Sequence, residues 1–223
     1  MSFGQIKSGG WNRALNIQQA EYMLEGLHLD VEQVKNDALA AVKGTAFGFD
    51  EAAKAAANFG ASGIKAGKEM EGALRGVAGV AAMTSSDFSS IADIFSTVAS
   101  NGKLMTMQLR QFSSRGLNVS AELAKVMHKT EAQINDMVSK GQISFKQFAE
   151  AMDEAFGEHA KDANKTFSGS LSNVKAALSR IGADFAEPIV DDMVPVFNSL
   201  MNSIDKIHED LKPLIKQFSD WNR

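Results

Sequence analysis

Cysteine is absent from this sequence, which excludes disulfide bonds, thiolate metal sites and a cysteine nucleophile. Long hydrophobic runs are absent too, because the longest weakly apolar stretch, residues 76–83, is far shorter than the ~20 residues of a membrane-spanning helix. The first residues contain no basic region followed by an apolar core, so the sequence predicts no signal peptide. These absences favour a soluble protein made in a reducing cytoplasm.

An excess of either charge is also missing. The 23 basic and 27 acidic residues give a formal net charge of -4, which provides no electrostatic footprint for nucleic acid or an anionic membrane. Hydrophobic residues make up 44% of the 223 residues, an ordinary share for a globular protein of one or two domains. We therefore expect no specific nucleic acid partner and no membrane contact for this segment.

Helix signals recur along the chain, whereas no stretch shows the sustained alternation of a strand. A capping residue followed three positions later by Gln or Asp occurs at Asp30, Thr84, Thr130 and Ser144. Met83 and Phe88 would form a hydrophobic staple around the second of these starts. The sequence predicts an all-α fold, a multi-helix bundle with about ten short helices at the average length of ~11 residues.

Glycine and proline divide the chain unevenly, since all three prolines lie in the last 36 residues and most of the 18 glycines precede them. Eight glycines crowd one alanine-rich segment: Gly44, Gly48, Gly60, Gly63, Gly67, Gly72, Gly76 and Gly79. A glycine inside a helix costs roughly 1 kcal/mol relative to alanine. The segment is therefore either a flexible outer part or a place of close helix packing, in a hairpin or an oligomer contact.

The C-terminal segment carries a heptad repeat that predicts a longer amphipathic helix. Its apolar residues follow alternating steps of four and three: Met193, Phe197, Leu200, Ile204, Ile207, Leu211, Leu214, Phe218 and Trp221. Pro213 should kink this helix near residues 209–212. The helix either packs on its own domain or forms an oligomeric coil. Because the pattern still runs at the last residue, we expect the sequence to be a fragment of a longer protein.

Within that segment we expect two different behaviours on the two sides of the kink. Residues 197–207 should dock on the rest of the chain. Residues 211–221 should project away and support weak self-association through Leu211, Leu214, Phe218 and Trp221.

One predicted helix presents an aromatic face, because Phe145, Phe148, Met152 and Phe156 follow one another at steps of three and four. We expect this face to form the core. Its predicted partners come from the preceding helix and from a later one: Ile134, Met137, Val138, Leu178 and Ile181.

Two pairs have the Glu-x-x-His spacing, or nearly so, of di-iron helical bundles: Glu25 with His28, and Asp205 with His208. Such a site needs two true Glu-x-x-His helices and further carboxylates, and Gly26 interrupts the first helix. The sequence contains no phosphate loop, dinucleotide fingerprint, His-Glu-x-x-His or Gly-x-Ser-x-Gly motif. We predict no catalytic, cofactor-binding or metal-binding residues and no enzyme activity, and a helical metal-dependent enzyme is an alternative.

Residues 118–143 also resemble a helix-turn-helix, which makes a DNA-binding regulator a second alternative. A helix that reads DNA should offer basic and amide side chains. The second predicted helix carries Glu131 and Asp136, and only Gln133 and Asn135 could contact base edges. A compact packing unit is therefore the favoured interpretation of this helix pair.

Residues 130–188 contain short motifs in a distinctive order. They are Ser139-Lys140-Gly141, Gln142-Ile143-Ser144-Phe145, Phe156-Gly157-Glu158-His159, Thr166-Phe167-Ser168-Gly169 and Ala176-Ala177-Leu178-Ser179-Arg180-Ile181-Gly182. Leu109-Arg110-Gln111-Phe112 and Gly10-Trp11-Asn12-Arg13 extend the pattern upstream. Together they resemble the conserved helical region found toward the N-terminal part of siphophage tail tape measure proteins.

The resemblance implies a structural virion protein that templates tail tube polymerisation, sets tail length and is later ejected ahead of the DNA. It implies the tail tube protein, tail assembly chaperones and tail tip or baseplate proteins as partners. The implied locations are the host cytoplasm during assembly and the virion tail lumen afterwards. We expect three segments: an Ala/Gly-rich helical part at 1–83, a compact core at 84–187 and the heptad helix at 188–223. One continuous domain is the alternative to this division.

Overall fold

The computed structural model describes residues 3–162, with side chains from 13 to 161. Ten helices follow one another within the described chain: α1 (Phe3–Gly26), α2 (Val31–Val42), α3 (Phe49–Ala61), α4 (Lys68–Thr84), α5 (Phe88–Asn101), α6 (Thr106–Ser113), α7 (Val119–Val126), α8 (Glu131–Ser139), α9 (Phe145–Phe156) and α10 (His159–Asp162). Residues 3–162 contain no strand, only an isolated bridge between Lys103 and Ser144. The all-α prediction is confirmed there, and the predicted heptad helix at 188–223 lies outside the described residues.

Two of the predicted helix starts carry complete capping boxes. At α8 the backbone N–H of Gln133 donates to Thr130 Oγ1 at 3.2 Å, and Gln133 Oε1 accepts from the backbone N–H of Thr130 at 2.9 Å. Ser144 and Gln147 repeat this exchange at α9, at 3.2 and 3.0 Å. The first start, Asp30, also caps its helix, because its carboxylate accepts from the N–H of Gln33 at 3.0 Å. These three helix starts are confirmed.

The fourth start, at Thr84, is wrong. Thr84 is the last residue of α4, and Asp87 occupies the N-cap position of α5. The Thr84 hydroxyl donates back to the carbonyl of Val80 at 2.8 Å, which extends the helix behind it rather than opening the next one. Met83 is 49% exposed and so does not clamp the start of α5. Ser85, in the left-handed region at φ 50°, ends α4 instead.

Because the caps differ in this way, their removal should have different effects. Thr130→Ala and Ser144→Ala should each lower the free energy of unfolding by about 1 kcal/mol, since each leaves backbone donors of a helix start without their partner. Thr84→Ala removes a hydroxyl that bonds to the Val80 carbonyl and to the Ser86 hydroxyl, and should cost clearly less because no backbone N–H of a helix start loses its partner. Urea unfolding of the three variants measures this order, and an equal loss at Thr84 would contradict the assignment.

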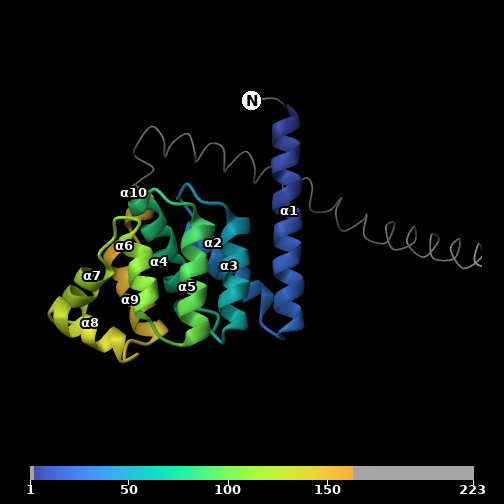
Figure 1. Ribbon diagram of the computed structural model, residues 1–223. Coiled ribbons are helices and arrows are strands. Elements are labelled where there is room, and N and C mark those ends of the chain that lie inside the picture. The colour runs from blue at the N-terminus through green and yellow to red at the C-terminus, as the bar shows by residue number, and fades with distance from the viewer. Residues whose placement is uncertain (1–2, 163–223) are drawn as a thin grey trace, which may run out of the picture.

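The bundle is organised around α4, which packs most extensively on α9 and also contacts α2, α3, α5 and α10. Figure 1 shows α4, α5 and α9 in the middle of the body, with α1 along one edge and α7 and α8 at the opposite edge. The buried apolar residues form one hydrophobic core, whose members range along the chain from Ala20 in α1 to Ala160 in α10. Residues on both sides of position 83 therefore share one core.

Glycines make the α4–α9 contact close. A Cβ atom added at Gly79 would lie 2.1 Å from the backbone oxygen of Phe156, and one added at Gly76 would lie 3.3 Å from the Cβ of Met152. No side chain fits at Gly79 unless the backbone of α9 shifts. Close helix packing is thus the correct interpretation at Gly76 and Gly79, although the partner helix is distant in sequence rather than the next one in the chain.

The aromatic face of α9 is buried as predicted, but its main partners differ from those expected. The ring of Phe148 packs at a tilt against Phe95 of α5 and Phe112 of α6, and the centroids of these two rings lie 4.7 and 5.8 Å from its own. The ring of Phe145 meets that of Phe59 of α3 edge to face, and the two ring centroids lie 5.8 Å apart. Ile134 and Val138 of α8 belong to the same core, but α7 is the element that contacts both α8 and α9. Met137 is only half-buried against this core, and Leu178 and Ile181 lie outside the described residues.

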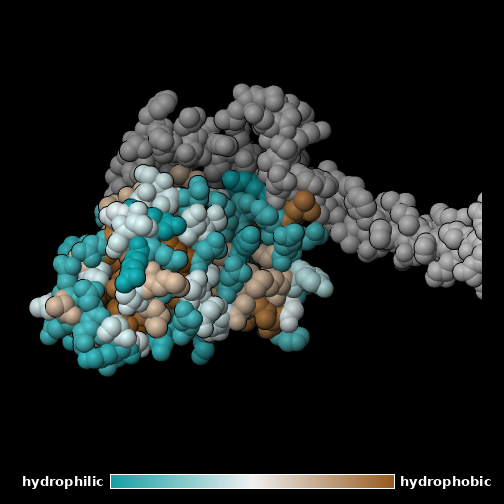
Figure 2. Space-filling view, viewed as in Figure 1, coloured by the Kyte–Doolittle hydropathy of each residue, from teal (hydrophilic) through white to brown (hydrophobic). Residues whose placement is uncertain are grey.

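Hydrophilic residues dominate the face of the molecule shown in Figure 2, with hydrophobic residues in smaller groups between them. Large apolar side chains that stay exposed include Tyr22 at 80% and Met107 at 60%. The large apolar side chains of the described residues lie mostly inside the bundle, where the burial of apolar area is the main stabilising contribution.

Candidate functional site

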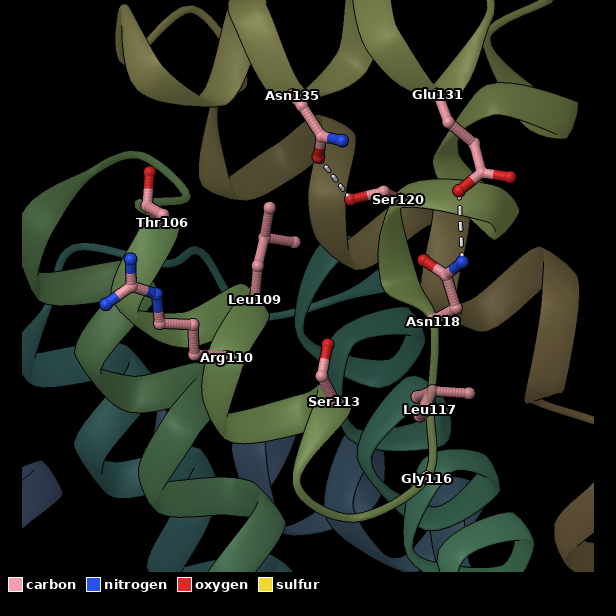
Figure 3. Close-up of a pocket in the computed structure, with 10 residues that line it drawn as sticks. All are labelled: Thr106, Leu109, Arg110, Ser113, Gly116, Leu117, Asn118, Ser120, Glu131 and Asn135. Carbon is pink, nitrogen blue, oxygen red and sulfur yellow. Dashed lines mark hydrogen bonds between the residues drawn. The ribbon is translucent and has the colours of Figure 1, made fainter.

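The first candidate site is an open groove of about 560 Å³ between α6, the following loop and the α7–α8 pair. Figure 3 shows its ten lining residues: Thr106, Leu109, Arg110, Ser113, Gly116, Leu117, Asn118, Ser120, Glu131 and Asn135. They combine two leucines with neutral polar groups and one charge of each sign. Below, this site is called the α6–α8 groove.

Local backbone chemistry positions this groove. Gly116 adopts φ 81°, a left-handed conformation that glycine tolerates without strain, and so lets the chain turn after α6. The N–H of Leu117 then donates to the carbonyl of Phe112 at 3.1 Å. Asn118 caps α7 by accepting from the N–H of Ala121 at 3.2 Å. The turn thus places Leu117, 8% exposed, at the bottom of the groove.

The two walls of the α6–α8 groove carry opposite charges. On the α7–α8 side, Asn118 Nδ2 donates to Glu131 Oε2 at 3.0 Å, and the Ser120 hydroxyl donates to Asn135 Oδ1 at 2.7 Å. On the α6 side Arg110 is exposed, and it makes no ion pair within residues 3–162. Leu109 points into the space between the walls, with Arg110 and Glu131 on its two sides (Figure 3). The groove suits an amphipathic segment with charges on both flanks.

A second groove, of about 530 Å³, lies between α1, α3 and α5. Arg13 of α1 pairs with Asp50 of α3 at 2.8 Å, and Asn16 Nδ2 donates to the other oxygen of Asp50 at 3.1 Å. Burial raises the pKa of the neighbouring Glu51, although the N–H of Gly48 donates to its carboxylate and opposes this shift. These contacts hold α1 on the bundle, which is a structural role.

A third charged cluster fixes the corner where α9 turns into α10. Arg75 of α4 pairs with Asp153 at 3.1 Å and with Glu158 at 3.0 Å. Burial raises the pKa of Asp153, opposed by Arg75 and supported by Glu158 and Glu71, while Lys161 acts in the lowering direction. Desolvation of the Asp153 carboxylate therefore outweighs its attraction to Arg75.

The raised pKa of Asp153 predicts a pH dependence of stability. The folded protein binds this proton more tightly than the unfolded chain, so the contribution of Asp153 is most favourable below its ordinary pKa of about 3.9 and is lost as pH rises through the folded value. Asp153→Asn should accordingly gain in melting temperature relative to the unaltered protein as pH increases from about 3 to about 7. Thermal melts across this range test it, and a difference that shrinks with pH would contradict the direction of the shift.

The structure assigns packing roles to the helix-turn-helix candidate at 118–143. Ile134 and Val138 are fully buried, which agrees with the compact packing unit. Of the two possible base readers, Asn135 is already bonded to Ser120, and Gln133 closes the capping box of α8. Asp136 pairs with Lys140 at 2.6 Å on the exposed face. The α8 surface thus offers little positive charge to a phosphate backbone.

Of the two candidate pairs with Glu-x-x-His spacing, the structure describes only Glu25 with His28, and these two residues do not lie on one continuous helix. α1 ends at Gly26, and His28 adopts φ 57° while its backbone N–H donates to the carbonyl of Glu25. Asp205 and His208 lie outside the described residues. Within residues 3–162 no three His, Asp or Glu side chains gather in a metal-binding arrangement. In the same part of the chain, no helix has the length and apolar character to cross a membrane.

The helix-turn-helix pattern at 118–143 drew attention to Asn118, Glu131 and Asn135, which line one wall of the α6–α8 groove, but it did not predict a groove. Arg110 stands within a family motif, and Leu109 and Leu117 look like ordinary core positions. The groove arises where three short helices meet, so only their packing reveals it.

These features define the class of protein: an all-helical packing module that carries surface grooves and, among the described residues, shows no assembled catalytic centre. The family model of tape measure proteins matches residues 16–187, and the chain belongs to this family. The family is structural, and membership gives the protein a structural role in a phage tail. No curated protein and no solved structure gives a significant match to the chain.

Proposed function

We propose that this chain is a folded module of a longer tape measure protein, which templates tail tube polymerisation, sets tail length and is ejected ahead of the DNA. The observation that carries the proposal is the family match over residues 16–187. The proposed location is the host cytoplasm during assembly and the tail lumen in the virion. The proposed partners are the tail tube protein, the tail assembly chaperones and the tail tip or baseplate proteins.

Within the parent protein, this module acts as a compact block rather than as the uniform rod that measures length. A helix advances 1.5 Å per residue, so the 223 residues would span roughly 330 Å as one rod. The described helices are instead four to 24 residues long and fold back on one core. The described parts of segments 1–83 and 84–187 share one core, which supports our proposal that these segments belong to one continuous domain. We propose that the heptad segment, 188–223, docks on this domain through residues 197–207 and continues toward the rod through residues 211–221.

Deletion of the module from the phage gene tests its role. Removal of residues 3–162 should abolish tails or give tubes of irregular length, because the block would be needed to start or organise assembly. A deletion of the same size in the rod should give uniform tails shortened by about 240 Å. Electron micrographs of the particles measure both results. Uniform shortening by about 240 Å from the module deletion would overturn the distinction between block and rod.

The extension supplies a second test, because its apolar residues need a partner in water. Weak self-association is expected through Leu211, Leu214, Phe218 and Trp221. Light scattering at high concentration should show association for residues 1–223 and none for a chain that ends at Glu209. If both remain monomeric, the heptad repeat packs within its own molecule.

A further inference from the structure

Only two residues, Gly157 and Glu158, separate α9 from α10. The N–H of Gly157 still donates to the carbonyl of Asp153 at 2.8 Å, as it would in a continuing α-helix. Beyond it the pattern changes, because Lys161 donates to the carbonyl of Glu158, only three residues back, at 3.1 Å. Within the described part of the chain, no N–H of residues 158–160 donates to a carbonyl of α9. One helical run is therefore interrupted after Gly157.

The interruption depends on close contact with α4 and on a glycine. In an unbroken helix the carbonyl of Phe156 would accept from the N–H of Ala160, but here its oxygen lies against Gly79 of α4. Ala160 is 1% exposed, and α10 packs on α4 (Figure 1). A Cβ atom added at Gly157 would lie 2.6 Å from the carbonyl oxygen of Asp153. The bent backbone thus has no room for a side chain at Gly157.

Arg75 of α4 joins the two sides of the interruption. Its Nε lies 3.1 Å from Asp153 Oδ1, before the break, and its Nη2 donates to Glu158 Oε1 at 3.0 Å, after the break. In an unbroken helix, residues five positions apart lie about 7.5 Å apart along the axis and about 140° apart around it. Asp153 and Glu158 would then face different sides, which places one guanidinium poorly for both. The double ion pair therefore stabilises the bent form.

The free energies that favour the bent form and an unbroken helix are both small. The side chain of Glu158 is 66% exposed, and ion pairs of exposed groups contribute little. Burial raises the pKa of Asp153, so its pairing with Arg75 does not compensate fully for the lost hydration. An unbroken helix would give the N–H groups of residues 158–160 partners in α9, and each such bond also has a modest net value. A small change at Arg75 is thus sufficient to alter the balance.

We propose that the α9–α10 junction is a two-state hinge. In the bent state Arg75 bridges Asp153 and Glu158, and in the straight state α9 continues through residues 157–162 as one helix. Arg75 selects the bent state, because both of its ion pairs can form only there. If the chain acts as a module of a tape measure rod, as proposed above, straightening would turn this end of the compact block into an outward-directed helix. The hinge itself is measured on the isolated chain, so its failure would leave the proposed function untouched.

Nuclear magnetic resonance of the full chain distinguishes the two states, because the N–H groups of Glu158 and His159 are bonded to α9 only in the straight one. Arg75→Gln removes ion pairs of the bent state and should slow hydrogen exchange at these two amides by about tenfold. Their Cα chemical shifts should move toward helical values. Gly157→Ala should act in the same direction, because a methyl group fits an unbroken helix but not the bent backbone. Should Arg75→Gln disturb folding, Glu158→Gln, at an exposed position, replaces it and is read at His159.

Lys161→Gln is the matched control. It removes an ion pair with Glu158 at 3.2 Å that lies within one turn of the chain and makes no connection to α4. Exchange at His159 should therefore stay as in the unaltered chain. Unchanged or faster exchange at His159 in both Arg75→Gln and Glu158→Gln would overturn the two-state hinge, because α10 would then remain bent or fray. Equal slowing by Lys161→Gln would overturn the role of Arg75 in selecting the bent state.

Discussion

Replacement of Gly79 by alanine should lower the free energy of unfolding by about 3 kcal/mol, the upper range for forcing an extra methyl group into a packed core. The added Cβ would meet the backbone oxygen of Phe156 at 2.1 Å, and a backbone oxygen cannot rotate away as a side chain can. This cost exceeds the gain of roughly 1 kcal/mol that alanine brings to a helix interior. Chemical denaturation measures the net loss.

Two other helical glycines provide matched controls for Gly79→Ala. Gly26, at the end of α1, has no atom within 4 Å of an added Cβ, so Gly26→Ala should be neutral or slightly stabilising. Gly72 faces only the carboxylate of Asp153 at 3.3 Å, a side chain that can shift, and should give a small change. If all three variants had equal stability, the close contact of α4 with α9 would not exist in solution.

Phe148→Ala should cost about 3–5 kcal/mol, the range for removing a fully buried phenylalanine and leaving a cavity. Phe148 has no exposed surface, and its ring contacts Phe95 and Phe112, so the loss affects α5, α6 and α9 together. Since α6 is a wall of the α6–α8 groove, the same variant should also loosen that groove. Urea unfolding monitors the first effect, and hydrogen exchange of α6 monitors the second.

Met107→Ala serves as the control for Phe148→Ala, because Met107 lies on α6 with 60% of its surface exposed. Its free energy of unfolding should change by no more than about 0.5 kcal/mol. A near-neutral result for Phe148→Ala would instead mean that the aromatic face of α9 is open to solvent and available to a partner.

Local signals in the sequence correctly predicted three of the four helix starts that we assigned from capping residues, at Asp30, Thr130 and Ser144. Thr130 and Ser144 cap their helices with groups only three residues away, so no distant contact is needed to recognise them. Thr84 shows where this reasoning fails. Its hydroxyl had two available uses, and continuation of α4 to that residue committed it to Val80. The packing of α4 decided between them, and that packing cannot be derived from four neighbouring residues.

The sequence by itself determined the all-helical class, the buried face of α9 and, through its motifs, the tape measure family. It did not determine that α9 packs against the glycines of α4. Nor did it determine that α6, α7 and α8 enclose a groove with Arg110 and Glu131 on opposite walls. Helix formation depends on contacts within three or four residues along the chain, which a sequence displays directly. The pairing of helices depends on side chains far apart in the sequence that meet only after the whole core has closed, so the tertiary structure alone decided it.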